Sequence, residues 1–137
     1  MKAVTIYQPW ASLIAAGLKT IETRTWATSY RGPLAIHAGK TVDLDGFRCL
    51  NRGLIDRVIG FARGQGWELP FPTGAILAVA ELVDCRVCVP GDRELALCEC
   101  ECVGWILEDV RALAAPVPCR GYQRIWTVDD AIGQRLR

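Results

Sequence analysis

Residues 17–24 read Gly-Leu-Lys-Thr-Ile-Glu-Thr-Arg, and the chain changes character within this stretch. Before it, apolar residues recur at helical spacing and stop at the glycine, a residue that commonly ends a helix. After it, Glu22, Arg24 and Trp26 alternate with threonines, which predicts a strand whose successive side chains point to opposite faces. The sequence therefore predicts that these three side chains share one face, with Lys19 in the turn just before them.

Two interpretations of this segment remain open. In the first, Lys19, Glu22 and Arg24 converge in one site. Trp10 or Trp26 beside them then supplies an aromatic face for a base, while the cations bind phosphate. In the second, Glu22 and Arg24 form an exposed ion pair next to a solvated lysine, an arrangement that contributes little to stability. The spacing by itself favours the second interpretation.

Short apolar or alternating stretches along the rest of the chain predict further strands. The near-continuous apolar run 75–83 is typical of a central strand buried on both faces. Pro116 and Pro118 indicate an edge strand, because proline cannot donate a hydrogen bond to a neighbouring strand. The strands are expected at residues 3–7, 22–26, 33–38, 75–83, 103–107 and 122–128.

Two more helices are predicted. An apolar stripe at helical spacing within residues 47–61 predicts one helix, capped by Asp43 or Asp45 and closed by a glycine-rich turn. Asp129 or Asp130 starts a short terminal helix. Mostly short strands with two or three helices predict a mainly β, α+β fold, in which a compact barrel carries helices on its outside.

Length and charge limit the function. The 137 residues are expected to form a single domain, 1–137. The formal net charge of +1 argues against tight, non-specific binding of polyanions. The charge is uneven, however: residues 1–63 carry nine basic and four acidic groups, whereas residues 64–137 carry seven and eleven. The basic half contains the 17–24 stretch, which leaves room for a small cleft that holds a few nucleotides.

No membrane or export signal is found. No stretch approaches the roughly 18 uninterrupted apolar residues of a spanning helix. The first residues show neither a long apolar core nor a cleavage pattern. A cytoplasmic location without membrane contact is therefore expected, and no cofactor is expected.

Seven cysteines raise the question of a metal. Their odd number, without a secretion signal, favours reduced thiols. Cys85 and Cys88 have the spacing of half a zinc site, but Cys98, Cys100 and Cys102 do not repeat it. In a strand, the last three would point to one face as small apolar side chains. Buried free thiols are expected here, with metal binding as the alternative.

Two single polar residues are further candidates. Glu81 is the only charge within the apolar run 75–83, so it must pair, hydrogen-bond or take up a proton. It is either a catalytic acid or base, with Lys19 and Arg24 as candidate partners, or a member of a structural ion pair. His37 is the only histidine and is either a ligand-binding residue or a hydrogen-bonded structural one.

The segment 116–126 combines arginines with aromatic residues. Arg120 and Arg124, with Tyr122 and Trp126 nearby, would line a groove for a single strand of nucleic acid. Alternatively, the glycine at position 121 marks a turn and Trp126 belongs to the core.

These motifs occur together in a known family. The chain resembles the ASCH domain (ASC-1 homology) family of the PUA-like superfamily, whose G-x-K-x-x-E-x-R core is intact in residues 17–24. The similar blocks follow in order along nearly the whole chain: 8–11, 17–24, 30–38, 72–76, 105–110 and 116–126.

The resemblance implies a fold and a function. The fold is a PUA-like small, mostly antiparallel β-barrel with flanking helices and a central cleft, and the cleft residues carry over onto Lys19, Glu22 and Arg24. Members are proposed to bind RNA or modified nucleotides, and some related proteins are nucleoside amidohydrolases or ribonucleases. In the amidohydrolase-like relatives a strand glutamate acts, and Glu81 occupies a comparable position. Those relatives have threonine where this chain has Glu22.

Two main functions follow. The first is a module that binds RNA, a nucleotide or a nucleoside. The alternative is a small hydrolase in which Lys19, Glu22 and Glu81 are catalytic, with Glu81 activating water and Lys19 stabilising an oxyanion. A third possibility, an adaptor that binds other proteins, is supported only by the acidic segment 94–108. The candidate ligand-binding residues are Trp10, Arg24, Trp26, Arg31, His37, Lys40 and Arg120.

Overall fold

The computed structural model describes residues 1–97 and 102–137, and strands account for much of them. The strands are β1 (Lys2–Gln8), β2 (Ile21–Arg24), β3 (Gly32–Val42), β4 (Ala75–Val87), β5 (Val103–Pro118) and β6 (Ile125–Thr127). The helices are α1 (Trp10–Ala15), α2 (Leu44–Cys49), α3 (Arg52–Gln65), α4 (Arg93–Ala96) and α5 (Asp130–Gln134), with a 3-10 turn η1 (Pro90–Asp92).

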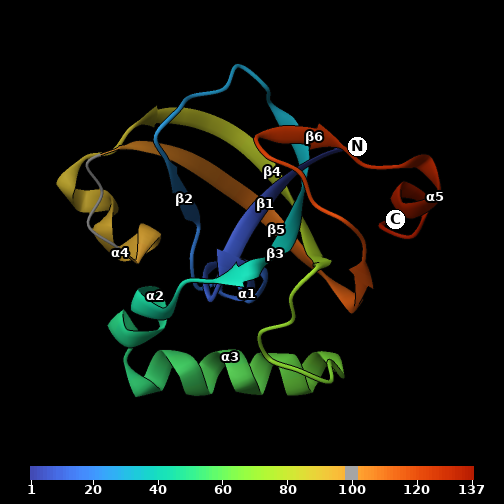
Figure 1. Ribbon diagram of the computed structural model, residues 1–137. Helices are drawn as coiled ribbons and strands as arrows, with labels where there is room; N and C mark the ends of the chain where they lie inside the picture. Colours follow the sequence, from blue (N-terminus) through green and yellow to red (C-terminus); the bar gives the residue numbers. More distant parts are fainter. Residues whose placement is uncertain (98–101) are drawn as a thin grey trace.

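The six strands of the described residues belong to one sheet in the order β2-β5-β4-β3-β1-β6. Among these strands, β1 and β3 pair in parallel, and every other neighbouring pair is antiparallel. The sheet curls strongly, and in Figure 1 β2 is seen to the left of β1, although β5, β4 and β3 separate the two in the sheet order. The mainly β, α+β fold with flanking helices is thus confirmed. Over the described residues the expected barrel is a curled sheet that is not closed, with β2 and β6 as its two edges.

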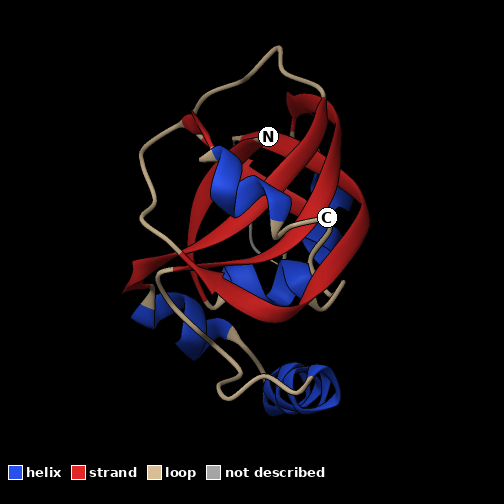
Figure 2. Cartoon of the chain, turned by 90° about the vertical axis from the view of Figure 1, so that its right-hand side faces the viewer, coloured by secondary structure: helices blue, strands red, loops and turns tan. Residues whose placement is uncertain are grey.

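Irregular pairing between the two longest strands accompanies the curl. The register of β4 against β5 shifts at three places between Ile76 and Asp84. Such bulges bend a strand and increase its local twist. Figure 2 shows the sheet wrapping around the interior as a result. The curl brings the first and last strands of the sheet toward each other, and the candidate site lies there.

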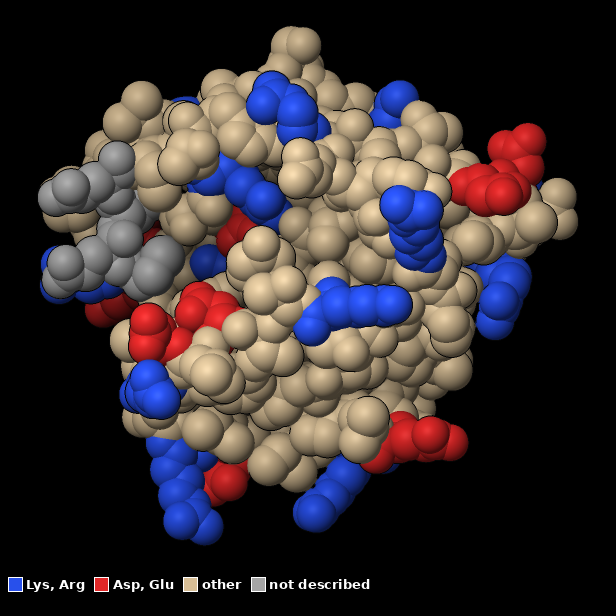
Figure 3. Space-filling model, in the orientation of Figure 1, with Lys and Arg blue, Asp and Glu red and all other residues tan. Residues whose placement is uncertain are grey.

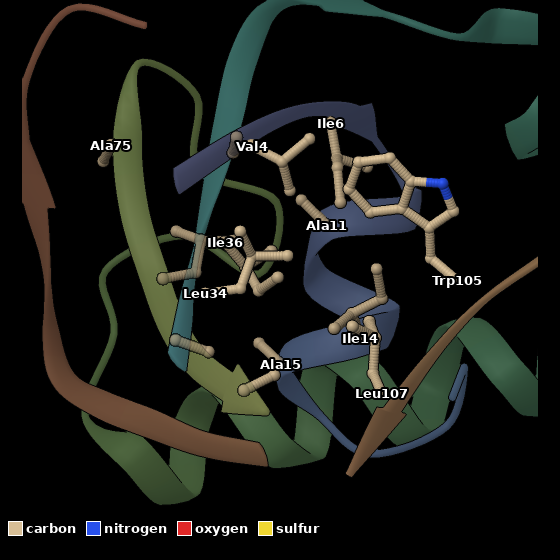
Figure 4. Packing of buried hydrophobic residues seen from close by; sticks show 14 of the residues in the cluster. Val4, Ile6, Ala11, Ile14, Ala15, Leu34, Ile36, Ala75, Trp105 and Leu107 are labelled. Atoms are coloured by element: carbon tan, nitrogen blue, oxygen red, sulfur yellow. The ribbon is translucent and has the colours of Figure 1, made fainter. Parts of the chain in front are cut away.

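The core lies inside this curl. Side chains of α1, including Ile14, pack against β3 residues such as Ile36 and against Trp105 of β5 (Figure 4). Residues 75–80 of β4 are buried without alternation, as expected for a central strand covered on both faces. A second apolar cluster, which includes Ala35 and Leu136, covers the opposite face of the sheet beneath α5.

The predicted helix over residues 47–61 is in fact two helices. Leu50 has extended backbone angles, and the Asn51 side chain accepts a hydrogen bond from Leu54 N at 2.8 Å, which starts α3. Apolar periodicity continues across this break, so it did not signal the break. The caps predicted for the ends are confirmed, since Asp43 caps α2 and Gly66 ends α3 in the left-handed conformation.

The C-terminal strands differ in length from their prediction. β5 continues from the expected 103–107 to Pro118, whereas the strand expected over 122–128 shortens to β6. β2 pairs only with residues 103–106 of β5, which leaves the later part of β5 without a second neighbour. Pro116 and Pro118 therefore sit on an open strand edge, where the sequence placed them.

Among the described cysteines, Cys49, Cys85 and Cys119 carry free thiols, whereas Cys88 is disulfide-bonded. The expectation of reduced thiols is therefore wrong for Cys88. Two of the residues in the metal question, Cys98 and Cys100, lie outside the described residues. Within residues 1–97 and 102–137, no helix has the length and apolar character that crossing a membrane requires.

Candidate functional site

A cavity of ≈ 1270 Å³ lies where the two edges of the curled sheet approach each other. Its walls come from β1, β2, β3 and residues 119–124, which lead into β6. Arg24 Nη2 on β2 donates a hydrogen bond to the carbonyl of Thr5 on β1 at 2.6 Å, although the two strands are not neighbours in the sheet. On the face seen in Figure 3, Lys and Arg side chains border a recess.

The described lining of this cavity is basic and aromatic. Five basic and two acidic side chains give it an excess of three positive charges. The basic residues are Lys19, Arg24, Lys40, Arg120 and Arg124, the acidic ones Glu22 and Asp43, and the aromatic ones include Tyr7, Trp10, Trp26 and Tyr122.

A buried ion cluster forms the floor of the cavity. The Glu22 carboxylate lies 3.7 Å from Lys19 Nζ and 3.3 Å from Arg24 Nη2. Lys19 is 1% exposed and Glu22 is 7% exposed. Lys19 Nζ also donates to the carbonyl of Ala96, and Glu22 Oε1 accepts from the Thr23 amide at 3.1 Å. The exposed pair favoured by spacing alone is thus wrong, because the curled sheet encloses the cluster.

One donor in this cluster has no partner. Arg24 Nε is buried and makes no hydrogen bond within the part of the chain that the structure describes. A buried donor without an acceptor costs free energy, so it favours a ligand that brings an acceptor. Arg24 lines the cavity, where such a ligand would enter.

Both candidate stacking tryptophans already carry a cation. Trp10 donates from Nε1 to Asp43 Oδ2 at 2.9 Å, and Lys19 Nζ lies 5.2 Å from its ring centroid. Trp26 packs edge-on against Trp105 with ring centroids 4.8 Å apart. The guanidinium carbon of Arg124 lies 4.3 Å from the Trp26 ring centroid. At both tryptophans of the cavity, an aromatic ring and a positively charged group therefore lie next to each other.

His37 is held in a chain of hydrogen bonds at the cavity wall. Its Nε2 lies 2.9 Å from the Cys119 carbonyl, which only accepts, so Nε2 carries a proton. Its Nδ1 lies 3.2 Å from the Thr5 hydroxyl, whose oxygen accepts from Trp126 Nε1 at 3.1 Å. A neutral ring satisfies every partner, and burial lowers the pKa of His37, partly offset by the Cys119 carbonyl.

This arrangement requires a glycine at position 121. A Cβ placed on Gly121 would lie 2.5 Å from the His37 ring and 2.6 Å from Thr5 Oγ1. The close approach of the backbone lets residues 119–124 lie directly against the histidine. His37 therefore holds this segment in place through its hydrogen bond to Cys119. It is a hydrogen-bonded structural residue and also one of the residues that line the cavity.

We expect the stability to depend on pH through His37. The folded pKa lies below the ordinary value of 6.5, so the unfolded chain binds more protons between the two values. Lowering the pH below about 6.5 should therefore destabilise the protein by at most about 1.4 kcal/mol per pH unit. Urea unfolding of wild type and His37→Gln measures this, because glutamine keeps a donor and an acceptor without titrating. Equal pH slopes in the two proteins would contradict a neutral His37.

The segment 119–124 presents exposed cations at the mouth of the cavity. The Arg120 guanidinium lies 5.1 Å from the Tyr122 ring centroid, and Arg124 has a left-handed backbone with φ of 60°. A non-glycine residue adopts this conformation uncommonly. Lys40, at the end of the buried part of β3, is also exposed and lines the cavity.

Two of the expected site residues lie elsewhere. Glu81 on β4 faces Pro33 and Glu108 in the sheet register and is not among the residues that line the cavity. Its expected partners, the cations of the buried cluster, pair with Glu22 instead. Arg31 lies outside the lining as well, with its guanidinium 3.7 Å from Asp84 on the exposed surface. The bulges in β4 and β5 make these positions hard to place from alternation alone.

Sequence reasoning missed several residues of the lining. Thr5 connects Arg24, His37 and Trp126, yet nothing in its surroundings in the sequence marks it. Asp43 was expected only as a helix cap, but its second oxygen also anchors Trp10. Among the described residues, no group of three or more His, Cys, Asp or Glu side chains is arranged to hold a metal ion.

Comparison with known proteins identifies the family. Residues 4–134 match the model of the ASCH domain. The chain belongs to the ASCH domain family. It is 28% identical over 137 residues to activating signal cointegrator 1 of Mus musculus and 27% identical over 136 residues to that of Homo sapiens. Each alignment covers 96% of this chain but 23% of the relative, so this ASCH domain spans about a quarter of their length.

A solved structure shares the fold. The crystal structure of ASCH from Zymomonas mobilis matches with a TM-score of 0.57 at 12% identity, covering 98% of this chain and 92% of that one. Membership in the ASCH domain family supports a general role in binding RNA or nucleotides.

Proposed function

We propose that the cavity of this ASCH domain binds a short single-stranded segment of RNA or a single nucleotide, modified or unmodified. The observation that carries the proposal is the combination, in one cavity, of an excess of three positive charges with aromatic rings. Proteins that bind single strands combine a basic groove that follows the phosphates with aromatic side chains on which bases stack.

The position of each charge assigns its role. At the floor, Glu22 balances part of the charge of Lys19 and Arg24. At the mouth, Lys40, Arg120 and Arg124 have no carboxylate within ion-pair distance among the described residues. Phosphates of the ligand therefore bind at the mouth, where unbalanced cations meet solvent, and the base enters toward the floor.

The floor offers groups that recognise the polar edge of a base or ribose. Among the described residues, Arg24 Nε is a donor that lacks an acceptor, and a base carbonyl, a ring nitrogen or a 2′-hydroxyl would supply one. Glu22 supplies acceptor oxygens next to it. A donor beside an acceptor suits a base edge better than a second phosphate, which offers oxygens alone.

Binding of a labelled ten-nucleotide single-stranded RNA of mixed sequence tests the proposal. Three phosphate contacts at the mouth predict a roughly twentyfold loss of affinity between about 50 and 200 mM salt. The double variant Lys40→Ala/Arg120→Ala should bind more weakly at low salt, and its slope against the logarithm of salt should be shallower by about 1.4. Fluorescence anisotropy measures both quantities.

A matched control removes charge from another surface. Arg52 and Arg57 are exposed on α3, which contributes no described residue to the lining. The double variant Arg52→Ala/Arg57→Ala removes two positive charges from the net charge, as Lys40→Ala/Arg120→Ala does. Because these residues do not line the cavity, the affinity of this variant should depend on salt as steeply as that of wild type. Equal losses in the two double variants would mean that general charge, and not this cavity, attracts the RNA.

The hydrolase alternative finds less support. It required Glu81 to activate water beside Lys19, and Glu81 is not among the lining residues. Lys19 Nζ is also engaged by the Ala96 carbonyl and by Glu22. We therefore keep Lys19 and Glu22 in the proposed site as binding residues.

A further inference from the structure

The tryptophan that offers a stacking surface is covered in this structure. The Arg124 guanidinium lies over the Trp26 ring at 4.3 Å, in the position that a stacked base would take. Trp105 packs perpendicular to the same ring and donates from Nε1 to the Trp26 carbonyl at 3.2 Å. Trp26 is thus fixed by the core, and the group that moves on stacking must be Arg124.

Arg124 is exposed and held by few contacts, whereas the other cation over a tryptophan is buried and hydrogen-bonded. Lys19 lies over Trp10, but its ammonium is buried and bound to the Ala96 carbonyl and Glu22. Within residues 1–97 and 102–137, the Arg124 side chain contacts the Trp26 ring and makes no ion pair. A base can therefore displace Arg124 from Trp26 but cannot displace Lys19 from Trp10.

A displaced guanidinium has an obvious new partner. Arg124 shares the mouth of the cavity with Lys40 and Arg120, where the proposed function places phosphate. Guanidinium binds phosphate through two parallel hydrogen bonds, which are stronger than an exposed contact with a ring. A nucleotide thus supplies both the base that uncovers Trp26 and the phosphate that receives Arg124.

We propose that Arg124 makes this site selective for phosphorylated nucleotides over nucleosides: it covers Trp26 in the free protein, yields the ring to the base and binds the phosphate. A nucleoside must displace the guanidinium without giving it a new partner, so it binds weakly. This inference rests on the proposed function, because it names the class of ligand that the same cavity selects.

Calorimetric titration with the four ribonucleosides and their 5′-monophosphates tests the selectivity. Arg124→Ala should bind nucleosides about two- to fivefold more tightly, since the ring no longer has to be uncovered. The same variant should bind monophosphates about tenfold more weakly, since a charge-assisted contact is lost. Alanine keeps the Cβ at this left-handed position, so the variant changes the side chain alone, and Arg124→Gln provides a second uncharged variant.

Arg120→Ala is the matched comparison, because Arg120 lies over Tyr122 rather than Trp26. It should weaken the binding of monophosphates without tightening that of nucleosides. A shift of the Trp26 indole signal in NMR spectra, assigned with Trp26→Phe, should accompany the binding of monophosphates to wild type.

The outcomes separate this inference from the proposed function. If Arg124→Ala weakens nucleosides and monophosphates equally, the guanidinium is a stacking partner and the selectivity proposal is wrong. If Arg124→Ala changes neither affinity, the proposal is wrong as well, although RNA binding by wild type still supports the proposed function. If wild type binds neither RNA nor any nucleotide, both proposals fall together.

Discussion

Replacing Glu22 by alanine is expected to lower the free energy of unfolding by about 3–5 kcal/mol, which is among the largest effects predicted for this ASCH domain. Glu22 lies between Lys19 and Arg24 at the floor of the cavity, where Lys19 is 1% exposed. Without the carboxylate, the buried Lys19 ammonium is left unpaired beside the partly exposed Arg24 guanidinium, a situation more costly than the loss of a surface pair. Guanidinium chloride unfolding at neutral pH measures the loss.

Two further variants isolate the charge. Glu22→Gln keeps the shape and an acceptor for the Thr23 amide, so it should lose less than Glu22→Ala. In a Lys19→Met background, the alanine variant should cost clearly less, because one of the two uncompensated cations is gone. A loss of under about 1 kcal/mol in the wild-type background would show that water reaches the cluster in solution.

Trp105→Ala is expected to have a comparable effect on stability, about 3–5 kcal/mol, and a second effect on binding. Trp105 is fully buried in the core, its ring supports Trp26, and its Nε1 donates to the Trp26 carbonyl. Removing the ring leaves a large void and frees Trp26 to move. We therefore expect the folded variant, measured below its melting temperature, to bind the labelled RNA more weakly than wild type.

Trp67→Ala is the matched control for this prediction. Trp67 is also buried and hydrogen-bonded, through Nε1 to the Leu113 carbonyl at 3.0 Å, and it packs edge-on against Phe61. It does not line the cavity. Both variants should unfold more easily, but Trp67→Ala should keep the RNA affinity of wild type. If both lose affinity alike, the loss reflects general loosening of the domain rather than support of Trp26.

Local patterns predicted much of the fold. Apolar and alternating stretches identified the strands, the glycine of the 17–24 stretch ended α1 as expected, and Asp43 and Gly66 mark helix ends. These features depend on neighbours within a few residues, which a sequence displays directly. The break between α2 and α3 was not predicted, because the asparagine that caps α3 lies within an apolar stripe that continues across the break.

Local patterns predicted less of the candidate site. Lys19, Glu22 and Arg24 were expected to converge through their spacing and family resemblance, yet the spacing alone favoured an exposed pair. Burial decides between the two interpretations, and burial depends on which distant segments cover β2. Glu81 was expected to join this cluster because a single charge in an apolar strand needs a partner, and the family resemblance supported this, but the sheet register sets it opposite Glu108, outside the lining.

By itself, the 17–24 stretch determined that a helix gives way to a strand and that a cation precedes a carboxylate and a guanidinium on that strand. Only the tertiary structure decided that β2 meets β1 across the cavity, that Thr5 receives Arg24, and that Arg124 covers Trp26. The physical reason is the distance along the chain over which each feature is determined. Side-chain periodicity follows from backbone geometry within one element, whereas the curl of the sheet results from twist and bulges accumulated over all six strands.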